Sequence, residues 1–381
     1  MDSKWKNRVR LWLSQVADGI FALFVVSPLV VGFWRGVWQL LDNYLYPEDK
    51  DLSIFISAVI GSVIPVAFTV FRETLQKKCL KSKVIFYCVS RVYTSVFAFA
   101  CVNNWRSLWT FLDVYTGINL TSIISSIIIG MVVLALMRCY RSIGAPPMFI
   151  ATDSERGYFT FPTMFNVSVE SSFAKALLDS MFSVCFCGYL VVAVWRGSFH
   201  LLDFILFPDA IEKSAWGSIV LGYSCSILMM TAQKPASLFF GEVSGLTRLV
   251  FFNLYNLFAF IGSVNTWRGL WNFYNVYILP ENPFLSNMLT ASVGFVILTF
   301  IGASHSILVR GVLRDVSETG ENVAFFPYHY FLENFQGNED TIQNEDKNGK
   351  AKGMKDESDH NTKCLNNHIS SEVIVYRETV V

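Results

Sequence analysis

The chain has 381 residues, of which 53% are hydrophobic and only 16% are charged. A soluble globular protein carries about 25% charged residues, so this composition excludes an ordinary soluble domain and indicates a membrane protein. The formal net charge is zero and no nucleic-acid-binding motif is present, which argues against a nucleic-acid partner.

Eight segments are apolar over the roughly 20 residues that a helix needs to cross the hydrocarbon core of a bilayer. In chain order they are 16–34, 52–71, 84–102, 118–137, 177–195, 214–232, 246–264 and 285–303. A run such as Ile123 to Met137 lacks the apolar and polar alternation of membrane β-barrel strands. We therefore expect an all-α, polytopic membrane helical bundle with about eight transmembrane helices in contact with the lipid bilayer.

Lysine and arginine are concentrated at the N-terminus and in the loops that follow the even-numbered spans. Positively charged loops face the cytosol, so we expect both termini in the cytosol, with residues 1–15 as a basic N-terminal segment. Residues 335–370 are rich in Asn, Asp, Glu, Lys and Gly. The segment 331–381 is therefore expected to be a disordered cytosolic tail.

A motif of Trp, Arg, a small residue and a second aromatic residue follows every odd-numbered span, with Asp or Asn closing it. The four copies are Trp34-Arg35-Gly36-Val37-Trp38 with Asp42, Trp105-Arg106-Ser107-Leu108-Trp109 with Asp113, Trp195-Arg196-Gly197-Ser198-Phe199 with Asp203, and Trp267-Arg268-Gly269-Leu270-Trp271 with Asn275.

The spacing of these copies indicates an ancient duplication. The first and third leading tryptophans lie 161 residues apart, and the second and fourth lie 162 apart. Asp153 and Asp315 also match at an offset of 162. We expect two halves, 16–165 and 166–330, each made of two two-span units. Because every unit enters and leaves on the same side, the repeats are parallel and all four motifs belong to the outer face.

Two interpretations of the motif compete. In the first, the tryptophans anchor each helix at headgroup depth, while the arginine and the acid of neighbouring copies pair and lock the bundle. In the second, four arginines form a ring that attracts an anionic ligand to an outward vestibule. The acids Asp42, Asp113 and Asp203 would weaken such a field, which favours the first. The helical spacing predicts an interfacial amphipathic helix or an extension of each span.

Ionisable groups at bilayer depth are candidates for function. Arg91 lies in the third span, and its counterpart at an offset of 162 is Asn253. Arg91 could bind an anionic solute, pair with an acid inside the bundle or extend to the cytosolic surface, and a structural role is favoured. Asp18 and Asp179 fall in the first turn of their predicted spans, where a carboxylate suits the helix dipole. Both are also candidates for proton coupling.

The sequence predicts no enzyme. No two of the five histidines have metal-ligand spacing, and neither a nucleophile elbow nor a phosphate-binding glycine loop is present. No catalytic residue, metal or cofactor is expected. The cysteines lie in or beside apolar runs or in the tail, so structural disulfides are not expected.

The four Trp-Arg-Gly-x-Trp…Asp units on an eight-span frame resemble the Fuseless family of arthropod membrane proteins over roughly residues 10–330. Ser107, Phe199 and Asn275 depart from the pattern, and Asn275 puts pairing in the fourth copy in doubt. The resemblance implies a neuronal, presynaptic plasma-membrane protein that helps to organise active zones. It also implies a voltage-gated calcium channel among the partners, and it carries no catalytic residues.

The C-terminus has the form of a PDZ ligand. It ends in Glu378-Thr379-Val380-Val381, in which Val381 would fill the apolar pocket of a PDZ domain while backbone amides hold its carboxylate. Thr379 supplies the hydroxyl that such domains commonly bond. A PDZ-domain scaffold protein is therefore a predicted cytosolic partner.

Three functions fit these features. The leading hypothesis is a neuronal membrane scaffold or regulator that acts through protein partners. A solute transporter or channel with a polar site near Arg91 is the alternative, because parallel repeats suit that class as well. A trafficking chaperone for another membrane protein is the third. A dry, packed bundle centre would favour the scaffold, and a polar cavity at Arg91 would favour transport.

The tail hypothesis predicts that adding one residue after Val381 abolishes binding to a panel of PDZ domains, because the added residue displaces the terminal carboxylate from its amide site. Pull-down with the native and extended tails measures this. Equal capture by both tails would contradict the prediction.

Overall fold

The computed structural model describes residues 3–79, 82–154, 157–309, 311–315, 326–328 and 330–331, and over these residues it is helical with no strand. The predicted tail 331–381, including Glu378, Thr379, Val380 and Val381, lies outside the described residues except for its first residue.

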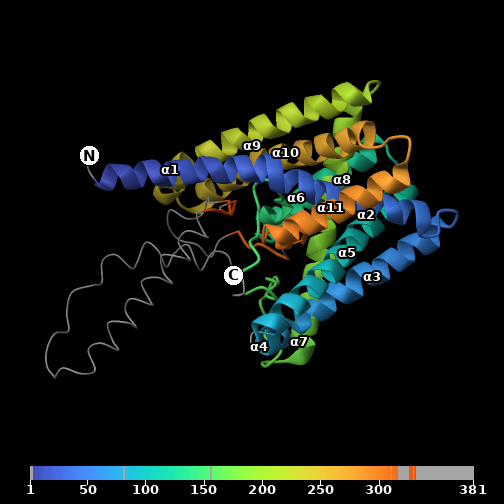
Figure 1. The fold of residues 1–381 in the computed structure, drawn as a ribbon, viewed down its shortest axis with the longest axis horizontal. Helices are drawn as coiled ribbons and strands as arrows, with labels where there is room; N and C mark the ends of the chain where they lie inside the picture. The colour runs from blue at the N-terminus through green and yellow to red at the C-terminus, as the bar shows by residue number, and fades with distance from the viewer. Residues whose placement is uncertain are drawn as a thin grey trace.

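The chain forms a succession of long helices, most of them joined by short turns, and a long segment connects α6 to α7 (Figure 1). In chain order they are α1 (Ser3–Phe21), a π-helical segment η1 (Ala22–Val26), α2 (Ser27–Tyr44), α3 (Lys50–Val70), α4 (Arg72–Cys79), α5 (Lys83–Thr116), α6 (Leu120–Leu136), η2 (Tyr140–Ile143), α7 (Phe173–Met181), a π-helical segment η3 (Phe182–Cys187), α8 (Gly188–Ile205), α9 (Ile211–Glu242), α10 (Gly245–Tyr277), α11 (Pro283–Phe300) and η4 (Ser304–Ile307).

Seven of the described helices are long and apolar enough to cross a membrane, and the first of them runs without interruption through α1, η1 and α2. The eighth predicted crossing corresponds to α6, which has 17 residues. At 1.5 Å per residue this helix is about 26 Å long, near the thickness of the hydrocarbon core. The predicted polytopic helical bundle is therefore confirmed.

The odd-numbered crossings are longer than the sequence predicted. Their expected ends at residues 34, 102, 195 and 264 are followed by further helix up to Tyr44, Thr116, Ile205 and Tyr277. The hydropathy pattern stops early because the Trp-Arg motif lowers local hydrophobicity, whereas the backbone continues. The motif is thus an extension of each span, one of the two arrangements expected, and not a separate interfacial helix.

The eight crossings form two concentric layers. The inner helices α2, α5, α8 and α10 contact one another, and each carries one Trp-Arg motif. Each outer helix packs chiefly against the inner helix of the following repeat: α3 on α5, α6 on α8, α9 on α10 and α11 on α2 (Figure 1). The last unit therefore closes on the first, and the two sequence halves interlock through the α6–α8 and α11–α2 contacts.

Each outer helix packs closely against its inner helix because it presents a stripe of small residues. The stripe reads Ser, Ser or Thr, and Gly at intervals of four, which places all three on one helical face. Its four copies are Ser53, Ser57 and Gly61; Ser122, Ser126 and Gly130; Ser214, Ser218 and Gly222; and Ser286, Thr290 and Gly294. A Cβ on Gly61 would lie 2.2 Å from the backbone nitrogen of Asn104 on α5. Small residues that allow backbones to touch are the usual basis of helix association in membranes.

We expect Gly61→Ala to destabilise the protein by about 1–3 kcal/mol, because the added methyl group overlaps the α5 backbone and forces the two helices apart. Gly188→Ala is a matched control within α8, since its Cβ would meet its nearest neighbour at 3.6 Å. Unfolding of the purified protein in detergent measures both. A Gly61→Ala variant as stable as Gly188→Ala would contradict this packing.

Candidate functional site

The four motif arginines each reach back to the residue that closes the motif of the preceding repeat. The four bonds run from Nε to a side-chain Oδ1: Arg106 to Asp42 at 2.7 Å, Arg196 to Asp113 at 2.7 Å, Arg268 to Asp203 at 2.8 Å and Arg35 to Asn275 at 2.7 Å. The interlocking of neighbouring copies that the first interpretation predicted is therefore confirmed, with ion pairs in three copies and an amide in the fourth.

Each guanidinium also bonds the hydroxyl stripe of an outer helix. Arg106 on α5 donates Nη1 to Ser57 at 2.8 Å and Nη2 to Ser53 at 2.9 Å, both on α3. Because Asp42 belongs to α2, one guanidinium joins three helices. We call this arrangement an arginine clamp. The other clamps use Ser122 and Ser126, Ser214 and Ser218, and Ser286 and Thr290.

The arginines of the clamps are buried, whereas their acids are partly exposed, and this difference sets the energetic role of each clamp. Arg106 and Arg196 are fully buried, with 0% relative exposure. Removing a buried charge from water is costly, and the cost is recovered only where every donor is bonded and the partner charge is close. Sequence reasoning missed the serines, although Ser53 and Ser57 recur as Ser214 and Ser218 at a common offset of 161.

The leading tryptophans of the motif lie inside the bundle and not on its lipid-facing surface, so the anchoring role that the first interpretation gave them is wrong. Trp34, Trp105, Trp195 and Trp267 face one another inside the bundle and form a closed ring of edge-to-face contacts, with centroids 5.4–5.7 Å apart. In each motif the arginine directly follows the leading tryptophan, so the two side chains point in different directions from the helix. Because the arginine points to neighbouring helices, the tryptophan points to the centre of the bundle. The indoles thus serve as core, not as membrane anchors.

A second aromatic layer stands one turn further along the same helices. Trp38 contacts Trp109 at 5.6 Å and Trp271 at 5.9 Å, and Trp109 contacts Phe199 at 5.6 Å. Edge-to-face pairs at these distances stabilise beyond their area burial. The two layers together fill the centre of the bundle at the end that carries the arginine clamps.

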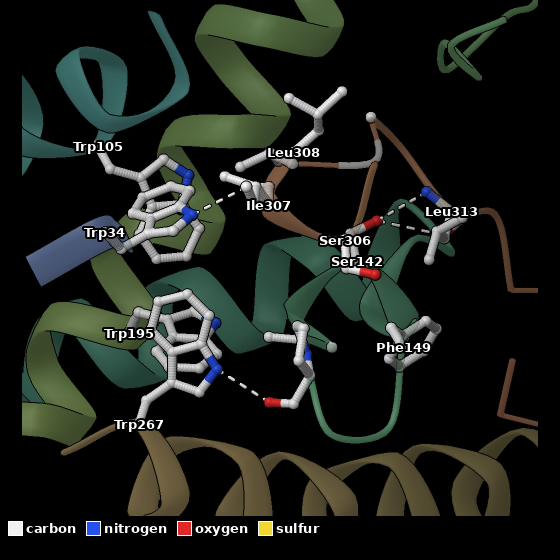
Figure 2. Close-up of a pocket in the computed structure, with 15 residues that line it drawn as sticks. Trp34, Trp105, Ser142, Phe149, Trp195, Trp267, Ser306, Ile307, Leu308 and Leu313 are labelled. Carbon is white, nitrogen blue, oxygen red and sulfur yellow. Dashed lines mark hydrogen bonds between the residues drawn. The ribbon is translucent and has the colours of Figure 1, made fainter. Parts of the chain in front are cut away.

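Two segments, one between α6 and α7 and one after α11, fill the bundle on the other side of the tryptophan ring. Indole Nε1 donates to backbone carbonyls of these segments: Trp34 to Ile307 at 2.8 Å, Trp195 to Ile143 at 3.0 Å and Trp267 to Pro146 at 2.9 Å. Figure 2 shows the four indoles on one side of a small cavity and the two segments on the other. The cavity holds about 60 Å³, room for a few water molecules.

Asp153 and Asp315, which match at an offset of 162, brace these two segments against each other. Asp153 accepts bonds from Ser304 Oγ at 2.7 Å and the backbone of His305 at 2.9 Å. Asp315 accepts from the backbone nitrogens of Tyr140 and Arg141 at 2.5 and 2.8 Å. Burial raises the pKa of Asp315 to about 6, although both backbone bonds act in the opposite direction.

Of the predicted intramembrane pair Arg91 and Asn253, Arg91 has side-chain partners in the bundle. Arg91 donates Nη1 to Asp153 at 2.5 Å and to Ser304 at 3.0 Å, which is the pairing with an acid that the sequence allowed. Asn253, its counterpart, has no bonded partner for Oδ1 within the described residues. Arg91 and Asn253 are therefore not equivalent in the two halves.

The helix-dipole account of Asp18 and Asp179 is wrong. The helix that contains Asp18 begins at Ser3, so this carboxylate lies far beyond the first turn. It accepts bonds from the backbone of Tyr330 and Phe331, and Asp179 accepts from Thr163, Phe165 and Val167. Both aspartates hold returning segments of the chain, which hydropathy alone cannot reveal.

The chemistry that this arrangement offers is mutual restraint of helices. The described residues contain no group of three or more His, Cys, Asp or Glu that could hold a metal. Within each of three clamps the arginine and the aspartate neutralise each other. The centre of the bundle is lined by aromatic side chains.

A family model described as Fuseless matches residues 13–308. No curated protein and no solved structure matches the chain.

We expect Arg106→Gln to destabilise the protein by about 3 kcal/mol or more, because Asp42 loses its cation and Ser53 and Ser57 lose their donors. The double variant Arg106→Gln with Asp42→Asn should cost less than the two single variants together, since neither change then strands a charge. Detergent unfolding of all four proteins measures the coupling. Strictly additive effects would contradict the clamp.

Proposed function

This chain belongs to the Fuseless family, whose model covers residues 13–308, and on that premise we propose that it organises the presynaptic active zone and the placement of voltage-gated calcium channels through protein partners. Family membership is the observation that carries the proposal. Membership supports a neuronal membrane protein in general terms, and together with the helical membrane fold it favours a role without catalysis.

The packing of the bundle supports a scaffold over a transporter. Two aromatic layers fill the centre at the clamp end, and the returning segments fill the region beyond the tryptophan ring. Arg91, the residue on which a transport site would depend, is engaged by Asp153 and Ser304. A frame with these internal contacts is suited to holding partners at a fixed place in the membrane.

The proposed orientation puts both termini in the cytosol of a neuron, at the plasma membrane. The positive charge of the loops after the even-numbered spans supports it, and α4 with Lys77 and Lys78 belongs to such a loop. This orientation presents the C-terminal Glu378-Thr379-Val380-Val381 to cytosolic PDZ domains. The tail would then link the membrane bundle to the scaffold of the active zone.

Rescue of neurons that lack the endogenous protein tests this function. We expect the wild-type chain to restore presynaptic calcium-channel clusters and the evoked presynaptic calcium signal. The chain with one residue added after Val381 should reach the membrane but restore less of both, because its tail cannot dock. A membrane-localised wild-type chain that restores neither would contradict the proposal.

A solute transporter or channel is the second candidate, and the small cavity beside the tryptophan ring is the observation in its favour. Flux of ions and solutes into liposomes containing the purified protein decides between the two. The scaffold hypothesis predicts no flux above that of empty liposomes. Flux that is lost in Arg91→Ala would make transport the primary function.

A trafficking chaperone for another membrane protein shares the features of the scaffold. The two differ in where the protein resides, since a chaperone stays in the secretory membranes and a scaffold stays beside its partner. Surface biotinylation of the tagged chain in neurons distinguishes them.

A further inference from the structure

The fourth arginine clamp differs from the other three in charge. In three clamps the motif arginine meets a carboxylate, whereas Arg35 meets the neutral amide of Asn275. His200 contacts Asp113 Oδ1 at 3.1 Å in another clamp. Gln39 matches His200 at an offset of 161 and donates to the same Asn275 Oδ1 at 2.9 Å. Oδ1 of Asn275 therefore already accepts from two donors, Arg35 and Gln39.

The remaining contacts of Arg35 are weak. Its Nη1 lies 3.3 Å from Ser286 Oγ and 3.4 Å from Thr290 Oγ1, longer than the corresponding bonds of Arg268, which are both 2.6 Å. In the other clamps Nη2 is bonded to Ser53, to the carbonyl of Gly117 or to Ser214. No residue in the described part of the chain accepts a bond from Nη2 of Arg35.

This cation is nevertheless buried, since Arg35 is only 3% exposed. Arginine stays protonated in proteins, and an uncompensated buried charge is strongly destabilising. Within the described residues no Asp or Glu lies within ion-pair distance of Arg35. The clamp therefore has one donor group and one positive charge left over.

We propose that the fourth clamp binds one compact anionic group at Nη2 of Arg35, and that this group supplies the negative charge that a carboxylate supplies in the other copies. Ser286 and Thr290 belong to the first two turns of α11, so the site lies near one surface of the bilayer. A chloride ion from the adjacent water and a phosphate oxygen of a lipid headgroup both have the required size and charge. Nη2 of Arg35 provides the donor, because the hydroxyls of Ser286 and Thr290 already donate to the backbone carbonyls of Ile278 and Ser286.

The other copies supply matched variants. Asn275→Asp replaces the amide by the carboxylate found in three clamps and should remove the need for an external anion. Asp42→Asn makes the reverse change at Arg106 and should create a second anion-dependent clamp. Neither change alters side-chain size, so differences between the variants report charge.

Thermal unfolding in detergent, after removal of lipid, tests the inorganic source with sodium chloride against sodium gluconate at equal ionic strength. At a chloride concentration about ten times its dissociation constant, the wild-type Tm should rise by about 2 °C. Asn275→Asp should have the higher Tm in gluconate and show no chloride shift. Asp42→Asn should have a lower Tm in gluconate and a larger chloride shift than the wild type.

Native mass spectrometry of protein extracted gently from the membrane tests the lipid source. A bound phospholipid retained by the wild type and lost in Asn275→Asp would assign the site to a headgroup phosphate, and the chloride shift would then appear only after lipid removal. The proposal is overturned if neither the chloride shift nor phospholipid retention differs between the wild type and Asn275→Asp. If Asn275→Asp does not fold, an Asp42→Asn variant whose Tm ignores chloride and lipid overturns it as well.

Discussion

The fold depends on the need to satisfy buried guanidinium groups inside a membrane. A motif arginine such as Arg106, fully buried, cannot be neutralised within its own helix. Its partners come from the preceding inner helix and from an outer helix, so Asp42 on α2 and the serines of α3 must all converge on it. Repeating this requirement four times orders the helices and brings the last repeat back to the first. The small residues of the outer helices make the necessary close approach possible.

The clamps also explain the aromatic centre. Once the arginine face of an inner helix points to its neighbours, the tryptophan of the same motif faces the middle of the bundle, and four indoles meet there. Their N–H groups are then buried donors that need acceptors. Carbonyl groups of Ile143, Pro146 and Ile307 meet that need for Trp195, Trp267 and Trp34. These bonds draw the segment between α6 and α7 and the segment after α11 into the bundle. Aromatic side chains and these segments fill the centre of the frame, so its proposed role in holding partners falls to its lipid-facing surface and its tail.

Some features could be predicted because they depend on residue order alone. Hydropathy locates the spans, and the offset of 161 or 162 relates Asp18 to Asp179 and Asp153 to Asp315 without knowledge of contacts. The pairing of Arg with the acid of a neighbouring copy follows from charge balance. The position of the tryptophans could not be predicted in this way, since an indole suits both a headgroup layer and a protein core. Only the direction of the helix face distinguishes the two environments.

The sequence by itself determined the membrane class, the number of apolar segments, the fourfold motif and the substitution of Asn275 for an acid. These are properties of composition and spacing, which local chemistry decides. The tertiary structure decided which outer helix packs on which inner helix, where the indoles point and that Arg91 meets Asp153. Those choices depend on groups far apart in the chain, because a buried donor or charge selects its partner only when the whole bundle has closed around it.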